Sequence, residues 1–97
     1  MKPVDVRKQH AEAWDRLFAL VKKRNHLLDD LGTSAKYAGD FSPATGMFME
    51  FDFERAQQIL AKVQEMTPAI YAAIDELNGY AEQIGKPRIE RKKWTPP

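Results

Sequence analysis

The side chains best suited to chemistry in this sequence are two histidines and several carboxylates. His26 is followed three and four residues later by Asp29 and Asp30, and His10 lies one helical turn before Trp14. A histidine beside a carboxylate can act as a general base or bind a metal. However, the sequence has no His-Glu-x-x-His motif, and its two histidines do not have the spacing of metal ligands. We therefore expect both histidines to have structural surface roles.

The paired acidic residues and the serine hydroxyl groups are no stronger evidence for catalysis than the histidines are. Asp75 and Glu76, like Asp29 and Asp30, fall in segments with helical periodicity, where acidic pairs are usually solvated. No glycine-rich phosphate loop follows a strand, and Ser34 and Ser42 lack the surroundings of a nucleophile elbow. We predict a protein that is not an enzyme, with no catalytic residue, no cofactor and no metal site.

Charge is balanced over the whole chain but uneven along it. The net charge is +1, from 15 basic and 14 acidic residues. Residues 53–85 contain two basic and five acidic residues, a net of −3, whereas residues 86–97 contain five basic and one acidic, a net of +4. This basic tail could bind an acidic protein, bind phosphates while Trp94 stacks on a base, or simply keep the chain end solvated. Its candidate partner-binding residues are Arg88, Arg91, Lys92, Lys93 and Trp94.

Residues 46–53, with the sequence GMFMEFDF, form a second unusual segment. Methionine and phenylalanine in a connection can form an adaptable binding surface, or they can plug the end of a helical bundle. We favour the plug, which requires Phe48 and Phe51 to be buried, whereas exposed side chains would indicate a binding site. The candidate binding residues here are Met47, Phe48, Met49 and Phe51.

Two long segments with helical periodicity must position these residues. In the first, about residues 5–31, Asp5 is a suitable N-cap and Gly32 a suitable end. The spacing of its apolar residues is typical of an amphipathic helix. They form two adjacent rows, one of Trp14, Leu17, Val21, Leu28 and Leu31 and the other of Val6, Ala13, Leu20 and Leu27.

The second helix is predicted over about residues 53–84, between an N-cap at Asp52 and a stop at Gly85. Pro68 indicates either a kink in one helix or a junction between two, and the unbroken apolar register favours the kink. The main row alternates steps of three and four, and a second row runs beside it at steps of seven. These rows are Phe53, Ala56, Leu60, Val63, Thr67, Ile70, Ile74, Leu77, Ala81 and Ile84, and Ile59, Met66, Ala73 and Tyr80.

The segment between the helices, residues 32–52, is rich in turn-forming residues and also carries aromatic residues. Residues 47–53 alternate like a strand, but a lone short strand has no partner, so we expect an extended, packed connection. The sequence thus predicts a single all-α domain of two long antiparallel helices. Each helix has two apolar rows, and a single partner helix cannot cover both of them. We therefore further expect a homodimeric four-helix bundle.

The expected function follows from this fold rather than from a motif. The chain has no cysteine, no apolar run long enough for a membrane span, and no signal-peptide pattern in residues 1–5, so we predict a cytoplasmic protein without membrane contact. Excess apolar rows favour a protein–protein interaction module, such as a small adaptor, regulator or inhibitor, that binds itself and an unknown protein. The alternative is a nucleic-acid-associated accessory protein that uses the basic tail.

Overall fold

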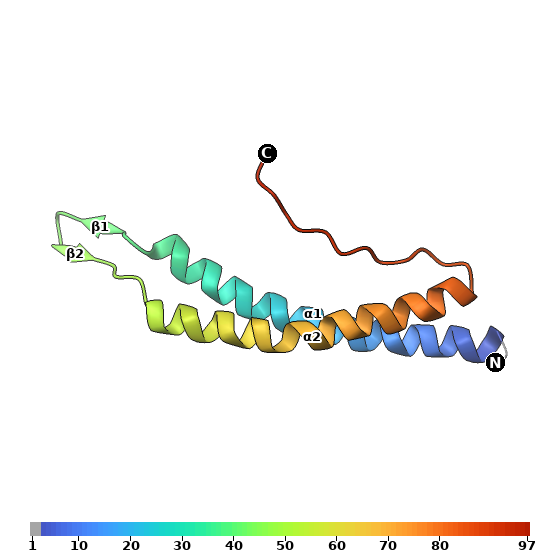
Figure 1. The fold of residues 1–97 in the computed structure, drawn as a ribbon. Helices are drawn as coiled ribbons and strands as arrows, with labels where there is room; N and C mark the ends of the chain where they lie inside the picture. The colour runs from blue at the N-terminus through green and yellow to red at the C-terminus, as the bar shows by residue number, and fades with distance from the viewer. Residues whose placement is uncertain (1–2) are drawn as a thin grey trace.

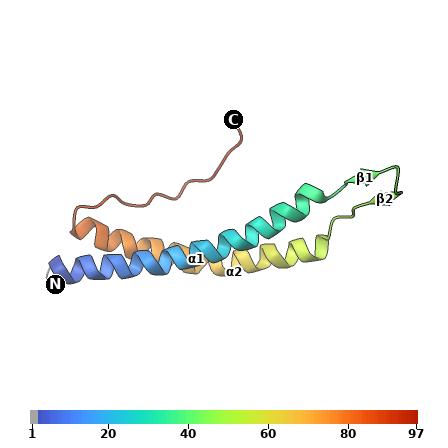
Figure 2. The same ribbon diagram turned by 180° about the vertical axis from the view of Figure 1, so that it is seen from behind.

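The computed structural model describes residues 3–97, which form an elongated helical hairpin (Figures 1 and 2). Helix α1 spans Pro3–Tyr37 and helix α2 spans Phe53–Gln83, and they pack against each other in opposite directions. Between them lie two short antiparallel strands, β1 (Phe41–Ser42) and β2 (Met47–Phe48). The molecule measures 69 × 28 × 18 Å. The prediction of an all-α hairpin of two long helices is confirmed.

The core lies in the seam between the two helices and is thin. Leu77 is its most buried large side chain, at 1% exposure, and it packs with Ala13, Leu17, Ile70 and Ile74. In α1, Val6 and Ala13 of one predicted row and Leu17 of the other are buried, whereas Trp14 and Leu28 of that second row are exposed. In α2, Leu60 and Phe53 of the main predicted row are likewise exposed. Each helix therefore buries only part of its apolar stripe.

Helix α1 is longer than predicted at both ends. Asp5 lies in its first turn instead of capping it, and Gly32 does not end it. A glycine inside a helix costs only about 1 kcal/mol relative to alanine, and Ser34 and Ala38 beyond it still lie half-buried. The chain leaves the helical direction at Gly39, whose φ of +82° suits glycine and whose N–H donates to the Met49 carbonyl at 2.8 Å.

Helix α2 has the predicted ends and runs through Pro68 without a break. The Asp52 carboxylate accepts a hydrogen bond from the Arg55 backbone N–H at 2.9 Å, which confirms the N-cap. At the other end, Gly85 has a φ of +71° and the Lys86 N–H donates to the Ala81 carbonyl at 3.0 Å. Figure 1 shows α2 bowed but continuous, so the interpretation as one helix is confirmed.

The prediction of an extended connection without strand pairing is wrong, because a partner strand lies just before residues 47–48 in the chain. Phe41 pairs with Phe48 and Ser42 with Met47 across a turn that begins at Pro43. Gly46 closes this turn with a φ of +68°, and its N–H donates to the Ser42 carbonyl at 2.8 Å. Only Met47–Phe48 of the alternating segment is a strand. The connection is a β-hairpin that stands beyond the ends of the helices (Figures 1 and 2).

Candidate interaction surfaces

Two ion pairs across the seam mark one side of the hairpin. Arg16 contacts Glu76 and Arg55 contacts Asp30, each at 2.5 Å between nitrogen and oxygen. The hydrogen bond from Arg55 to Asp30, together with the carboxylate charge, raises the pKa of the Arg55 guanidinium above its ordinary value. We call this side, with Arg16, Asp30, Arg55 and Glu76, the charged face. These pairs join the two helices at two levels and so help to set their register.

The opposite side carries the uncovered apolar residues Trp14, Phe18, Leu28 and Leu60, which we call the apolar face. Trp14 lies two residues from Arg16, and Leu28 two from Asp30, which is about 200° around an α-helix. Their exposed fractions are 48% for Trp14, 62% for Phe18, 37% for Leu28 and 48% for Leu60. The hairpin is therefore amphipathic across its width, with ion pairs on one face and large apolar side chains on the other.

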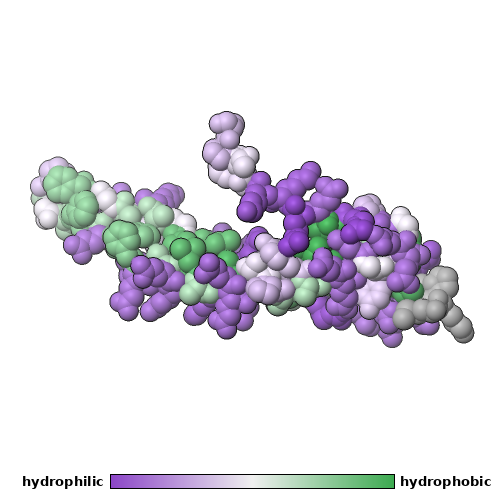
Figure 3. All heavy atoms as spheres, in the orientation of Figure 1, coloured by the Kyte–Doolittle hydropathy of each residue, from purple (hydrophilic) through white to green (hydrophobic). Residues whose placement is uncertain are grey.

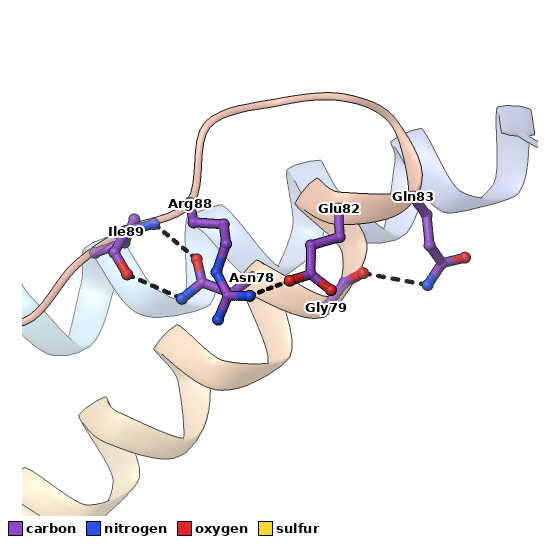
Figure 4. A network of polar contacts seen from close by, with 6 residues as sticks. All are labelled: Asn78, Gly79, Glu82, Gln83, Arg88 and Ile89. Atoms are coloured by element: carbon purple, nitrogen blue, oxygen red, sulfur yellow. Dashed lines mark hydrogen bonds and ion pairs between the residues drawn. The ribbon is translucent and has the colours of Figure 1, made fainter.

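The basic tail folds back over one end of the apolar face, where Asn78 holds it (Figure 4). The Asn78 amide donates to the Ile89 carbonyl at 2.9 Å, and its oxygen accepts from the Ile89 N–H at 2.7 Å. Asn78 is buried, and Ile89 packs against the core cluster. Because both polar groups of the buried amide are satisfied, this contact fixes the tail in one register. Sequence reasoning missed Asn78, whose only signal was a polar residue beside Leu77 in an apolar stretch.

The five tail residues predicted to bind a partner fall into two groups. Arg88 forms an ion pair with Glu82, and the Arg91 guanidinium lies 4.1 Å from the Tyr71 ring centre. The Lys92 Nζ atom lies 3.6 Å from the Glu90 Oε2 atom, but both side chains remain exposed to solvent. Lys93 is exposed as well. Trp94 is 83% exposed, the largest exposure among the large apolar side chains described. The docked part of the tail thus ends near Arg91, and residues 92–97 are available for contacts.

A groove of about 550 Å³ lies between the docked tail and α1. Leu77, Trp14 and Ile89 supply apolar lining, and Arg7 and His10 lie along its α1 side. His10 is therefore placed beside the tail. The groove shows that the tail covers the apolar face incompletely.

The hairpin tip, residues 37–54, is an exposed apolar surface. In the single chain Phe48 is 62% exposed instead of buried as a plug requires, while Phe51 is half-buried and packs edge-on against Phe53 at 4.9 Å between ring centres. The tip stands beyond the ends of the two helices of its own chain (Figures 1 and 2). Figure 3 shows hydrophobic side chains at this end and along the body towards the tail. The exposed large residues are Tyr37, Phe41, Met47, Phe48, Met49 and Phe53.

Of the other residues singled out for chemistry, Asp30 and Glu76 belong to the charged face. His26 and Asp29 line a shallow surface hollow, and the neighbouring Asp30 is occupied by Arg55. Within residues 3–97, no three histidine or acidic side chains come together as a metal site, and neither helix is long and apolar enough to cross a membrane. Comparison of the chain with protein-family models, curated protein sequences and solved structures found no match.

Proposed function

We propose that the protein is a non-enzymatic protein–protein interaction module whose first partner is a second copy of itself. The observation that supports this proposal is the accessible surface of 7964 Å². A compact monomer of 11.1 kDa exposes about 5,700 Å². The difference, about 2,300 Å², is comparable to the 1,000–2,500 Å² or so that each chain buries in a large obligate interface.

The apolar face is the surface that a second copy would cover. The Asp30–Arg55 contact places Leu28 and Leu60 at nearly the same level across the seam. Two hairpins joined at these side chains form a four-helix bundle with its ion pairs directed outward. Such an arrangement is self-complementary, as a two-fold interface requires. It also supplies the partner for the second apolar row of each helix.

A further, unknown protein partner is part of this proposal. The roles that fit a small domain of this kind are adaptor, regulator or inhibitor, and the cytoplasm is the location we propose. The alternative of a nucleic-acid accessory protein has weaker support, because Arg88 and Arg91 are engaged within the chain. A salt-sensitive mobility shift that requires residues 92–97 would favour that alternative.

Thermal unfolding over a range of protein concentrations tests self-association. Because only the folded state associates, Tm should rise by about 3–5 °C for each tenfold increase in concentration. Circular dichroism at 222 nm between roughly 1 and 100 µM covers the useful range. A Tm that stays constant over this hundredfold range would contradict the proposed homodimer.

A further inference from the structure

The two ends of the hairpin carry opposite charges next to exposed aromatic residues. The tip contains Asp40, Glu50, Asp52 and Glu54 and no lysine or arginine, a net of −4. The tail, residues 86–97, has a net of +4 and exposes Trp94. A surface that combines carboxylates with aromatic and methionine side chains is complementary to a segment that combines ammonium groups with an indole ring.

The tip also has a hollow suited to such a segment. Asp40, Phe41, Met47 and Met49 line a depression of about 360 Å³ on the β-hairpin. Its apolar side chains can pack against an aromatic ring, while the Asp40 carboxylate can accept a hydrogen bond or pair with a cation. The strands beside it form a sheet of two strands only, so their outer edges are unpaired.

The tail cannot reach the tip of its own chain while Asn78 holds it. Ile89 is fixed beside Asn78, which lies 25 residues along α2 from Phe53, a distance of about 38 Å. From Ile89 to Trp94 a fully extended chain spans only about 17 Å, and to the end of the sequence about 28 Å. Trp94 therefore cannot contact the tip of its own chain, and Figures 1 and 2 show the end of the tail standing away from the helices.

We propose that the two chains of the homodimer lie antiparallel, and that residues 92–97 of each chain bind the hairpin tip of the other. The inference rests on the proposed homodimer and adds its orientation and a reciprocal contact. The tail covers only the half of the apolar face farthest from the tip, near Asn78 and Tyr71. Antiparallel stacking brings the open halves of the two chains together and places the tail of each chain beside the tip of its partner.

The reach of the tail then sets where the two-fold axis passes. When fully extended along the helices, the tail can bring Trp94 towards the tip by at most about 17 Å from the level of Asn78, to roughly the level of Thr67. A partner's Phe53 comes to that level when the axis passes near Leu60. The same position of the axis brings the exposed Leu60 side chains of the two chains together. Lys92 and Lys93 then meet the carboxylates of Asp40 and Glu50 in the partner, and Trp94 enters the hollow.

A charge exchange between two full-length variants tests this contact. The tail variant carries Lys92→Glu and Lys93→Glu, which changes the tail from +4 to 0 and residues 92–97 from +2 to −2. The tip variant carries Asp40→Lys, Glu50→Lys and Glu54→Lys, which changes the tip from −4 to +2 and leaves the Asp52 N-cap intact. Either variant alone should dimerise at least about tenfold more weakly than the wild type, because tail and tip now have unfavourable charges.

Mixing the two variants should restore dimerisation, to within about threefold of the wild-type Kd. In the mixed dimer an acidic tail meets a basic tip and a basic tail meets an acidic tip, and native mass spectrometry identifies this heterodimer by its mass. The matched control for the tail variant carries Lys23→Glu and Lys62→Glu, on the side of the hairpin opposite the apolar face. It changes the net charge by the same −4 and should leave dimerisation unchanged.

Each other outcome overturns a different claim. If either variant dimerises like the wild type, the reciprocal contact is wrong and the homodimer stands. If the mixture stays as weak as the separate variants, the tail does not bind a partner's tip. If the wild-type protein does not dimerise, both the inference and the proposed homodimer fail.

Discussion

Replacing Leu77 with alanine should lower the free energy of unfolding by about 3–5 kcal/mol, towards the upper end for a buried leucine. Leu77 is 1% exposed and sits among Ala13, Leu17, Ile70 and Ile74, where the long, thin hairpin has little freedom to close a cavity. For a chain of this length, such a loss lowers Tm by on the order of 10–20 °C or more. Thermal unfolding followed by circular dichroism measures the change.

The control for this prediction is Lys62→Ala, which removes a long but exposed side chain from the same helix. Its unfolding free energy should stay within about 0.5 kcal/mol of the wild type. If Leu77→Ala unfolds within 2 °C or so of the wild type, the seam described above is not the core of the protein.

Replacing Leu60 with aspartate should dissociate the dimer while each hairpin remains folded. Leu60 is 48% exposed in the single chain and lies in the proposed interface, so the charge would be buried only on association. Burying an unpaired carboxylate at this position should weaken dimerisation by about 100-fold or more. Sedimentation velocity gives the Kd, and the helical circular dichroism signal shows whether the hairpin is intact.

Two further variants make the Leu60 prediction specific. Gln58→Asp adds the same charge two residues away, on another side of α2, and should leave dimerisation unchanged. Ile74→Asp places a charge in the seam of the single chain and should unfold it. The sequence pattern put Leu60 and Ile74 in one row, whereas the structure exposes Leu60 and buries Ile74. Unchanged dimerisation of Leu60→Asp would exclude the apolar face as the interface.

The two helices could be predicted because the capping residues and the apolar periodicity in the sequence agree with the way the helices pack. Asp52, Gly85 and the apolar periodicity all indicate the ends that α2 has. What periodicity could not decide is which of two adjacent rows faces the partner helix. Neighbouring rows differ by a small rotation, and the helical period of 3.6 residues drifts against a seven-residue spacing. Val6 and Ala13 therefore proved to be core, and Trp14 and Leu28 surface.

The tip and the tail could be predicted only in part, because their structure depends on contacts without periodicity. Phe41 to Phe48 is a short hairpin whose pairing rests on one turn, and two-residue strands are too short to show alternation. The contact between Asn78 and Ile89 joins a helix side chain to the backbone of a tail with three prolines, a pairing that no local pattern indicates. Residue type alone nevertheless placed Met47, Phe48 and Trp94 among the candidate binding residues, and all three are exposed.

The solution mass of the wild-type protein, measured by light scattering behind size-exclusion chromatography, tests the central proposal most directly. A homodimer of the 11.1 kDa chain should give about 22 kDa down to low micromolar concentration, as expected for an interface of the proposed size. The hairpin would then cover its apolar face with a second copy. A mass of 11.1 kDa at every concentration tested would contradict the account and leave Trp14, Phe18, Leu28 and Leu60 without the partner proposed for them.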